Sequence, residues 1–337
     1  MNRLREKFAF VVIGRNEGER LHKCLQSIMK VSHRVVYADS ASTDGSVALA
    51  KSMGIRVVEL DSSMPLNAAR GRNAGLEMVR RSFPQCRYVQ FIDGDCTLVD
   101  DWVDHALRFL DQRPRVAVAC GRRFEAKPDA SIYNHLANDE WNTRIGPAEE
   151  CGGDAMMRLR ALEEVGAFNP TLMASEEPEL SARLRARGWE IWRLDAPMTE
   201  HDAAMFHFQQ WWRRCLRAGY GNTQAWQATR NLPQRVNAGR LRSAFFWVVL
   251  VPMAALILAI VMQRTILLVA IPLIYTIQII RMSGRSSQLS MYAIRRSAMM
   301  MLGKVPELIG AARFLLSAKR PETIGYKNTP LPTSASQ

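Results

Sequence analysis

Residues 87–96, RYVQFIDGDC, place an apolar run directly before two carboxylates, Asp93 and Asp95. Tyr88–Ile92 is typical of a buried strand, because it is short and rich in aromatic and β-branched residues. Strand side chains alternate between faces, so both carboxylates can project to one side, and Gly94 between them lets a ligand approach the backbone. Two adjacent carboxylates repel each other unless a cation lies nearby. A Mg²⁺ or Mn²⁺ ion with bound phosphate supplies that charge. A polar exit from a strand into a loop explains such a pair, taken alone, about equally well.

Apolar runs of the same character recur along the first 120 residues and alternate with helical patterns. The predicted strands are 8–14, 34–39, 55–60, 88–92 and 116–120. The predicted helices are roughly 17–30, 44–53, 68–82, 100–112 and 154–190. This alternation predicts an α/β fold with a mostly parallel, helix-covered sheet. Ligands of such sheets bind beyond the carboxyl ends of the strands, where Asp39 and Asp93 are expected.

The formal net charge of +13 over 337 residues is concentrated in one segment. Residues 230–320 contain 13 Lys and Arg but a single acid, Glu307, whereas the rest of the chain is close to neutral. A basic segment by itself can indicate a nucleic acid partner. Here it brackets the most apolar part of the chain, so we expect a membrane surface as the partner and no nucleic acid.

Two uncharged runs, 244–262 and 265–280, are separated by Gln263 and Arg264 and flanked by arginines on their outer sides. The first run is about long enough to cross a bilayer, and the second is slightly short. The basic flanks predict that both outer ends lie in the cytoplasm. Six cysteines without a CxxC pair likewise indicate reduced thiols in that compartment. The alternative is a buried helical hairpin of a soluble domain.

The last part of the chain contains one more helical pattern and a polar tail. Segment 302–316 has apolar residues at spacings of three and four among basic ones, which is typical of an amphipathic helix at a membrane interface. The polar tail 321–337 contains three prolines and is expected to be disordered. We therefore predict an α/β domain over 1–229, a membrane-associated helical region over 230–320 and the tail. The α/β domain is expected on the cytoplasmic side of the inner membrane.

Two further motifs lie near the predicted strand ends. DSASTDGS, residues 39–46, places a carboxylate before small hydroxyl residues, so Asp39 can accept from a nucleobase or ribose and the loop can cap the next helix. NAARGRNAGL, residues 67–76, places Arg70 and Arg72 at a helix start, where the guanidinium charge and the helix dipole both favour an anion. Each motif alone is more simply explained as a capping loop or a solvated basic helix.

Taken together, the motifs of residues 8–220 resemble the family 2 glycosyltransferases, which are inverting enzymes of the GT-A fold. The matching segments, in order, are VVIGRNEGERLHKCLQSI, ADSASTDGS, ARGRNAGL, FIDGDC, GGDAMMRLRALEEVGAFNP and ASEEPELSARLRARGWEI. The resemblance implies that Asp39 binds the nucleobase and that Asp93 faces the ribose and diphosphate. It also implies that Asp95 binds a divalent metal, Mg²⁺ or Mn²⁺. Asn16, Glu17 and Arg70 are expected on the donor side.

The acceptor side of the family pattern falls on SEEPELSARL. The family usually has Glu-Asp or Asp-Asp there, with the second acid as the base. This position is Glu177, preceded by Glu176, and the substitution of Glu for Asp leaves the choice between the two open. A carboxylate next to the acceptor hydroxyl can remove its proton as the new bond forms. Without the other motifs, the pair also fits an acidic first helical turn. Gly153 and Asp154 in GGDAM are implied to contact the acceptor.

Two later segments complete the resemblance. His201 in TEHD is a candidate metal ligand, although a lone histidine is more often structural. FQQWWRRCLRAGYG, residues 208–221, resembles the family's Trp-x-Arg-x-x-Arg-x-Gly segment. Trp212 is implied to contact the acceptor, and Arg214 and Arg217, three residues apart on one helix face, are implied to meet the donor diphosphate. The longer Gln-x-x-Arg-Trp signature of polymerising members is absent in that order, which favours one sugar per event.

The sequence therefore predicts a membrane-associated enzyme that moves a sugar from a nucleotide-diphosphate donor to a lipid-linked or saccharide acceptor. Exopolysaccharide or cell-envelope glycan synthesis is the expected setting. Two alternatives remain. A nucleotidyltransferase also uses paired acids and a metal, but VVIGRNEGER has few glycines for its phosphate loop. A catalytically inactive scaffold would be expected to lose Asp95 or the base.

Overall fold

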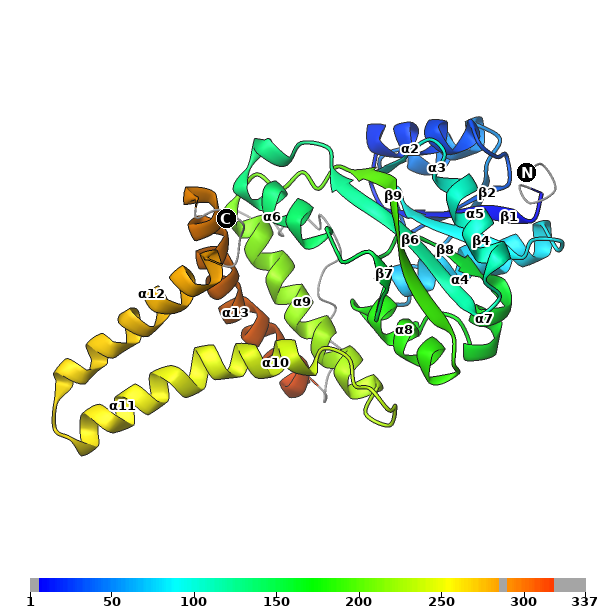
Figure 1. The fold of residues 1–337 in the computed structure, drawn as a ribbon. Coiled ribbons are helices and arrows are strands. Elements are labelled where there is room, and N and C mark those ends of the chain that lie inside the picture. The colour runs from blue at the N-terminus through cyan, green and yellow to red at the C-terminus, as the bar shows by residue number, and fades with distance from the viewer. Residues whose placement is uncertain (1–5, 285–289, 318–337) are drawn as a thin grey trace.

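The computed structural model describes residues 6–284 and 290–317, and within them the chain forms a single mixed sheet flanked by helices (Figure 1). The sheet order is β3-β2-β1-β4-β8-β6-β9-β5, and β7 pairs with β9 off this path. The strands are β1 (Phe8–Gly14), β2 (Val35–Asp39), β3 (Arg56–Glu59), β4 (Tyr88–Asp93), β5 (Cys96–Leu98), β6 (Val116–Glu125), β7 (Gly146–Pro147), β8 (Ala155–Arg158) and β9 (Glu190–His201). The predicted α/β class and the five predicted strands are confirmed, and β6 continues past its predicted end at Cys120 to Glu125.

The α-helices cover the sheet and then leave it. Those associated with the sheet are α2 (Glu19–Met29), α3 (Ser46–Ser52), α4 (Ala68–Ser82), α5 (Trp102–Gln112), α6 (Ile132–Glu140), α7 (Leu159–Val165) and α8 (Glu176–Ala186). The later helices are α9 (Phe208–Ala228), α10 (Ala238–Phe245), α11 (Val251–Val261), α12 (Ala270–Ser283) and α13 (Met291–Ser317). The core between sheet and helices contains fully buried aromatic residues, among them Phe8, Phe91 and Trp102.

The sheet is parallel only in part, which corrects the expectation of a mostly parallel sheet. β3, β2, β1 and β4 are parallel neighbours, as predicted. β8 then runs antiparallel between β4 and β6, and β5 runs antiparallel to β9. Because β8 separates the two parallel parts, the sheet divides into the parallel half β3-β2-β1-β4 and a second half built from distant segments.

The predicted helix over 154–190 is wrong in its first and middle parts. Residues Ala155–Arg158 form β8, because their apolar side chains complete the sheet between two buried strands. Helix α7 follows and ends at Gly166, whose φ of 78° is the left-handed conformation that glycine adopts readily. Helix α8 starts only at Glu176 and ends before Gly188. The loop between these helices leads to the acidic pair at the start of α8.

Two described helices are long and apolar enough to cross a membrane, at Ala238–Val261 and Thr265–Ser283. The first combines α10, a π-helical turn and α11. In Figure 1 the pair, in yellow and orange, extends away from the sheet as a hairpin. Their apolar side chains are exposed, with Ile260 at 66% and Ile277 at 56%. The hairpin is therefore not a buried core of this chain, which removes the main support for the soluble alternative.

Helix α13 extends the predicted segment 302–316 in both directions and packs along α9. The two helices approach so closely that a Cβ added at Gly219 would overlap the backbone carbonyl of Glu307. A Cβ at Gly310 would likewise overlap the carbonyl of Leu216. Glycine at these two positions therefore permits the close crossing that connects the hairpin to α9. The predicted tail 321–337 lies outside the described residues.

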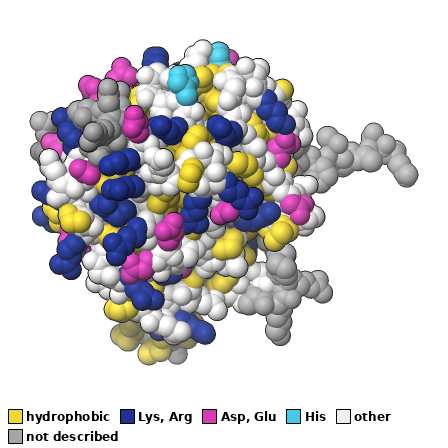
Figure 2. Space-filling view, turned by 90° about the vertical axis from the view of Figure 1, so that its right-hand side faces the viewer, with side chains coloured by type: hydrophobic (Ala, Val, Ile, Leu, Met, Phe, Trp, Pro, Cys, Tyr) yellow, Lys and Arg dark blue, Asp and Glu magenta, His cyan; other side chains and the backbone are white. Residues whose placement is uncertain are grey.

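Charged residues on the sheet-bearing part are mixed in sign. Figure 2 shows the face on the right of Figure 1, where Lys and Arg side chains are interspersed with Asp, Glu and apolar groups. Local pairs such as Arg81–Glu77, 2.9 Å apart, and Lys51–Glu59, also 2.9 Å apart, account for part of this balance. This agrees with the near-neutral composition outside 230–320.

Candidate active site

Two of the predicted site carboxylates end the two parallel strands that flank β1. Asp39 ends β2 and pairs with Gly14, while Asp93 ends β4 and pairs with Ile13 on the same central strand β1. Both carboxylates therefore lie at one edge of the sheet. The Gly94 amide donates to the carbonyl of Ile13 at 2.7 Å, which fixes the turn into Asp95.

A cavity of about 470 Å³ opens at this edge. It is lined by residues from the sheet edge, the start of α8, the segment 140–154 and the helices α9 and α10. Eight of the residues predicted for the site line it, namely Glu17, Asp93, Asp95, Asp154, Glu176, Glu177, Arg214 and Arg217. The fold thus brings together side chains that lie up to 200 positions apart in the sequence.

Asn16 and Asp39 are not among the residues that line this cavity, and their side chains connect two loops. Asp39 is buried and accepts hydrogen bonds from the Tyr37 hydroxyl at 2.8 Å and the Ser42 amide at 2.7 Å. Asn16 Oδ1 accepts from the Thr43 amide at 2.7 Å. These contacts hold the loop after β2 against the loop after β1.

Two predicted residues are directed away from the cavity. The Arg70 guanidinium donates to the backbone carbonyls of Asp61, Met64 and Pro65 at 2.7–3.1 Å, so it stabilises the preceding loop. Trp212 lines a separate outer hollow that includes Phe208. Neither residue is among those lining the main cavity.

Arg72 is the centre of a buried charge cluster. Its Nη1 lies 2.6 Å from Glu176 Oε1 and 3.1 Å from Glu177 Oε1, and its Nη2 lies 3.2 Å from Asp93 Oδ1. The absence of a side chain at Gly153 makes room for it, because a Cβ there would lie 2.5 Å from Arg72 Nη2. One buried cation thus faces three carboxylates, so the cluster has an excess of negative charge.

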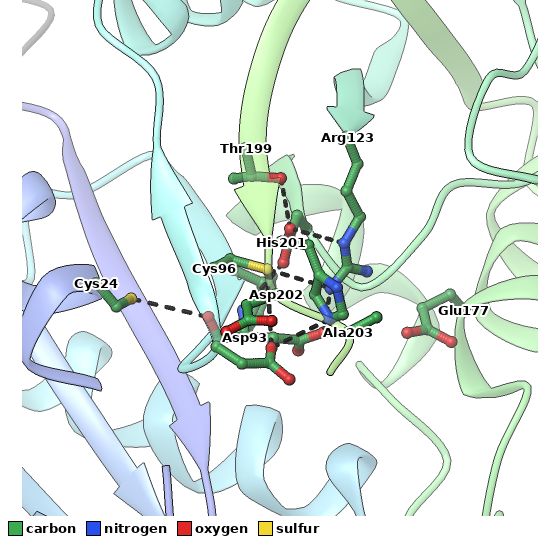
Figure 3. A network of polar contacts seen from close by, with 12 residues as sticks. Cys24, Asp93, Cys96, Arg123, Glu177, Thr199, His201, Asp202 and Ala203 are labelled. Carbon is green, nitrogen blue, oxygen red and sulfur yellow. Dashed lines mark hydrogen bonds and ion pairs between the residues drawn. The ribbon is translucent and has the colours of Figure 1, made fainter. Parts of the chain in front are cut away.

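The pKa of Glu177 is raised in this cluster. Burial and the charge of Glu176 raise the pKa of Glu177 to about 8, and Arg72 opposes only part of that rise. A carboxyl group with such a pKa can exchange a proton near neutral pH. Glu177 is also the more exposed of the two acids, with 16% of its side chain exposed against 6% for Glu176. In Figure 3 it lies across from the network around Asp93.

A second arginine, Arg123 on β6, was missed by the sequence analysis. Its Nη2 lies 2.9 Å from Asp93 Oδ2 and its Nε 3.4 Å from Asp154 Oδ2 (Figure 3). Asp154 also accepts from the Asp93 amide at 3.0 Å and from the Thr199 hydroxyl at 2.7 Å. The carboxylate of Asp154 is thus engaged within the protein, and it orders Asp93 and Arg123. The only sequence signal for Arg123 is the basic pair in GRRFE, directly after a predicted strand.

Asp95, Cys96 and His201 are placed so that a metal ion can be held between them, because their ligand atoms lie within 4.8 Å of one another. The His201 Nε2 and Asp95 Oδ1 atoms are 3.4 Å apart and both side chains are nearly buried. Carboxylate oxygen and imidazole nitrogen are suitable ligands for Mn²⁺. Burial raises the pKa of Cys96 well above its ordinary value, so its thiol stays protonated and is the poorest ligand of the three. The donor set therefore fits a divalent cation held by Asp95 and His201.

Arg214 and Arg217 face the cavity from α9. Arg214 Nη1 lies 2.7 Å from Glu140 Oε2, at the end of α6. Glu140 and Trp141 also line the cavity and were not predicted from the sequence. The Trp141 ring lies under the Arg123 guanidinium at 5.0 Å and against His201 at 4.7 Å. The segment that follows α6 therefore forms one wall of the site.

The sequence matches the profile described as "Glycosyl transferase family 2" over residues 9–166 and that described as "Glycosyl transferase family group 2" over residues 88–281. The second match covers more than half of the chain. The succinoglycan biosynthesis protein ExoA of Rhizobium meliloti (strain 1021) is 30% identical over 187 residues, which is 52% of this chain and 56% of ExoA. An uncharacterized glycosyltransferase of Rickettsia conorii is 37% identical over 55 residues, 16% of this chain and 20% of that protein. The chain thus matches about half or less of the length of these relatives.

Two solved structures with a similar fold illustrate the likeness. The mannosyltransferase PcManGT of Pyrobaculum calidifontis, solved with GDP-Man and Mn²⁺, has a TM-score of 0.62 at 16% identity, covering 93% of this chain and 88% of that chain. Residues 1–349 of TarS from S. aureus give a TM-score of 0.50 at 14% identity, covering 92% of each chain. At these identities the likeness shows the fold alone, and it confirms the predicted GT-A architecture.

Proposed function

The chain belongs to the family 2 glycosyltransferases, and on that premise we propose that it transfers a sugar from a nucleotide-diphosphate donor with inversion. The observation that carries the proposal is the single cavity at the strand ends. It combines a paired-acid donor side, Asp93 and Asp95, with a carboxyl group of raised pKa, Glu177. A displacement at an anomeric carbon requires charged groups that hold the donor and a separate group that accepts the acceptor's proton.

The donor is held from both sides of the cavity. Asn16, Glu17 and Asp39 bind its nucleoside part, and Asp93 faces its ribose and diphosphate. Asp95 and His201 would hold the divalent cation, Mg²⁺ or Mn²⁺, which would supply positive charge to offset the charge of the diphosphate leaving group. Arg214 and Arg217 contribute further positive charge, after Arg214 exchanges its contact with Glu140 for a phosphate oxygen.

The transfer is a single displacement. A Glu177 carboxylate oxygen accepts the acceptor hydroxyl proton while the hydroxyl oxygen forms a bond to the anomeric carbon. The bond from that carbon to the diphosphate oxygen breaks, and the electron pair leaves with the nucleoside diphosphate. Arg72 holds Glu176 and orients Glu177, and Gly153 leaves the space that the Arg72 guanidinium occupies. Because Asp154 is engaged with Asp93 and Arg123, it orders the donor side instead of contacting the acceptor.

The acceptor is delivered at a membrane surface. Asn237, directly before the first candidate span, and Arg240, in its first turn, line the same cavity as Glu177. The relative ExoA acts in succinoglycan biosynthesis. A lipid-linked saccharide of an exopolysaccharide, on the cytoplasmic side of the inner membrane, fits both observations. We expect the protein to remain in the membrane fraction after alkaline carbonate extraction. Release into the soluble fraction would contradict the membrane assignment.

Calorimetry and product analysis test the donor assignment. The full chain in detergent is titrated with UDP-, GDP- and dTDP-sugars with and without Mn²⁺, and the products of slow hydrolysis are identified. Metal-dependent binding of one donor, with release of the nucleoside diphosphate and the free sugar, supports the proposal. Release of pyrophosphate from a nucleoside triphosphate would indicate a nucleotidyltransferase instead, and no binding of any donor would indicate a scaffold.

A further inference from the structure

Glu125, at the last position of β6, is a buried acid to which the proposed mechanism gives no role. Its Oε1 accepts from the Lys127 amide and from Asn134 Nδ2, each at 3.3 Å. Its Oε2 accepts from the Ala203 amide at 3.1 Å. The carboxylate is therefore held in one orientation by three donors from three segments of the chain.

Strand pairing places this carboxylate directly beside His201. β9 lies between β5 and β6, and its last residue, His201, pairs with Cys96 on one side and with Glu125 on the other. The imidazole thus stands between two acids. Its Nε2 is 3.4 Å from Asp95 Oδ1, and its Nδ1 is 3.7 Å from Glu125 Oε2.

Within the described part of the chain, the Nδ1 atom of His201 has no hydrogen-bond partner. It is buried and makes no hydrogen bond at the present distance. A ring movement of roughly 0.5 Å toward Glu125 brings Nδ1 into the usual N–H···O range. The Trp141 ring packs against the His201 ring, with 4.7 Å between their centroids, and limits other movements of the imidazole. His201 is labelled in Figure 3.

We propose that Glu125 is a positioning residue for the metal site: it accepts a hydrogen bond from Nδ1–H of His201, so that the unprotonated Nε2 faces the position beside Asp95 where the cation would lie. A neutral imidazole has one N–H, and a ligand nitrogen must be the unprotonated one. Carboxylates in this outer position fix both the tautomer and the ring orientation of metal-binding histidines. The inference rests on the proposed function, because it needs His201 to bind the cation.

The competing role for Glu125 is purely structural, since it also holds the backbone at Ala203 and Lys127. The two roles differ in whether the effect of losing Glu125 depends on the imidazole of His201. A positioning residue acts through the imidazole, so its loss has no further effect once the imidazole is removed. A structural residue acts on the backbone, so its loss adds to that of the imidazole.

The test measures Mn²⁺ binding by the full chain in detergent, from the electron paramagnetic resonance signal of free Mn²⁺, with saturating UDP or GDP. The variants are His201→Ala, Glu125→Gln and the double variant. Asp104→Asn, which alters a buried acid on α5 outside the cavity lining, is the control. We expect Glu125→Gln to weaken Mn²⁺ affinity about 10- to 100-fold. The double variant should bind no more weakly than His201→Ala, and the control should match the wild type.

Three results would overturn parts of this picture. Unchanged affinity in Glu125→Gln, with weakened affinity in His201→Ala, removes Glu125 from the site and leaves the metal site standing. Losses that add in the double variant assign Glu125 a structural role. Unchanged affinity in His201→Ala removes His201 from the metal site, which contradicts the proposed function itself. Should Glu125→Gln not fold, Glu125→Asp, which withdraws the carboxylate by one methylene, takes its place with the same expected loss.

Discussion

Arg72 donates a hydrogen bond of 2.6 Å from Nη1 to Oε1 of Glu176, and both side chains are nearly buried. The next acid, Glu177, lies 3.1 Å from the same nitrogen and is the more exposed. The arginine therefore neutralises Glu176 first and leaves Glu177 as the acid available to an acceptor.

This arrangement predicts different outcomes for two matched variants. Glu177→Gln should bind donor normally but lose transfer by about 100-fold or more, because positioned base catalysis contributes about 10²–10⁴. Glu176→Gln should melt at a lower temperature, because buried Arg72 loses its charged partner, and should keep more activity than Glu177→Gln. Single-turnover transfer at saturating donor and a melting curve measure both. If Glu176→Gln were inactive and Glu177→Gln nearly normal, Glu176 would be the base and Glu177 would have the structural role.

The raised pKa of Glu177 predicts a pH dependence. Since only the deprotonated carboxylate can accept a proton, kcat/KM should rise with pH, with a midpoint near 8. The charge of Glu176 contributes to that rise in pKa, so Glu176→Gln should move the midpoint to lower pH. Initial rates between about pH 5.5 and 9.5 test this. A midpoint unaffected by Glu176→Gln would show that another group titrates.

The same group links pH to stability. The pKa of Glu177 in the folded chain lies above its ordinary value of 4.5, so the folded state binds more protons between pH 4.5 and about 8. Glu177 therefore lowers the free energy of unfolding as pH rises through this window. Glu177→Gln should flatten that fall. Melting temperatures at pH 5 and pH 8.5 compare the two proteins, and equal slopes would contradict the assignment.

Asp95 is predicted to carry the metal dependence of donor binding. Asp95→Asn should remove the Mn²⁺-dependent part of UDP or GDP affinity, with at least a tenfold weaker Kd, while the melting temperature changes little. The matched control is Asp101→Asn, an exposed acid near Asp95 with a φ of 64°, a conformation that asparagine also adopts. If Mn²⁺ still strengthens nucleotide binding in Asp95→Asn to the wild-type extent, the ion is held elsewhere.

Adjacent glycines provide a steric test of the Arg72 cluster. A Cβ at Gly153 would lie 2.5 Å from Arg72 Nη2 and 3.2 Å from both Asp93 Oδ2 and Glu177 Oε1, whereas one at Gly152 meets nothing within 4 Å. Gly153→Ala should displace the guanidinium, with about 1–3 kcal/mol of destabilisation. Transfer should fall at least tenfold, since Glu177 loses its orientation. Gly152→Ala should keep the wild-type melting temperature, because its methyl group enters open space. Equal changes in melting temperature would mean that the destabilisation does not come from contact with Arg72.

The sequence by itself determined the features that depend on local order. Alternating apolar strands and amphipathic helices predicted the α/β class, and the placement of Asp93 and Asp95 at the end of a buried strand predicted the sheet edge at which the cavity opens. The two apolar runs fixed the candidate spans. Each strand, helix and apolar run is a short stretch of consecutive residues, within which hydrophobic periodicity is informative.

The motifs did not reveal which residues of a helix face the cavity, because this depends on how the helix is rotated about its axis. Arg70 and Arg72 are two residues apart, as are Trp212 and Arg214, and two residues on a helix differ by about 200°. One member of each pair lines the cavity, and the other contacts a loop or faces outward. A motif that lists both residues cannot say which one faces the ligand, because that depends on where the helix packs.

The rest was decided by pairing between distant segments. Strand β8 looked helical, yet it completes the sheet between β4 and β6, which are separated from it by dozens of residues. The register of β9 between β5 and β6 is what brings Asp95, His201 and Glu125 together. The cluster of Arg72 with Glu176 spans 104 positions. Such contacts form only when the whole sheet closes, because burying these charges is favourable only where their partners are already in place.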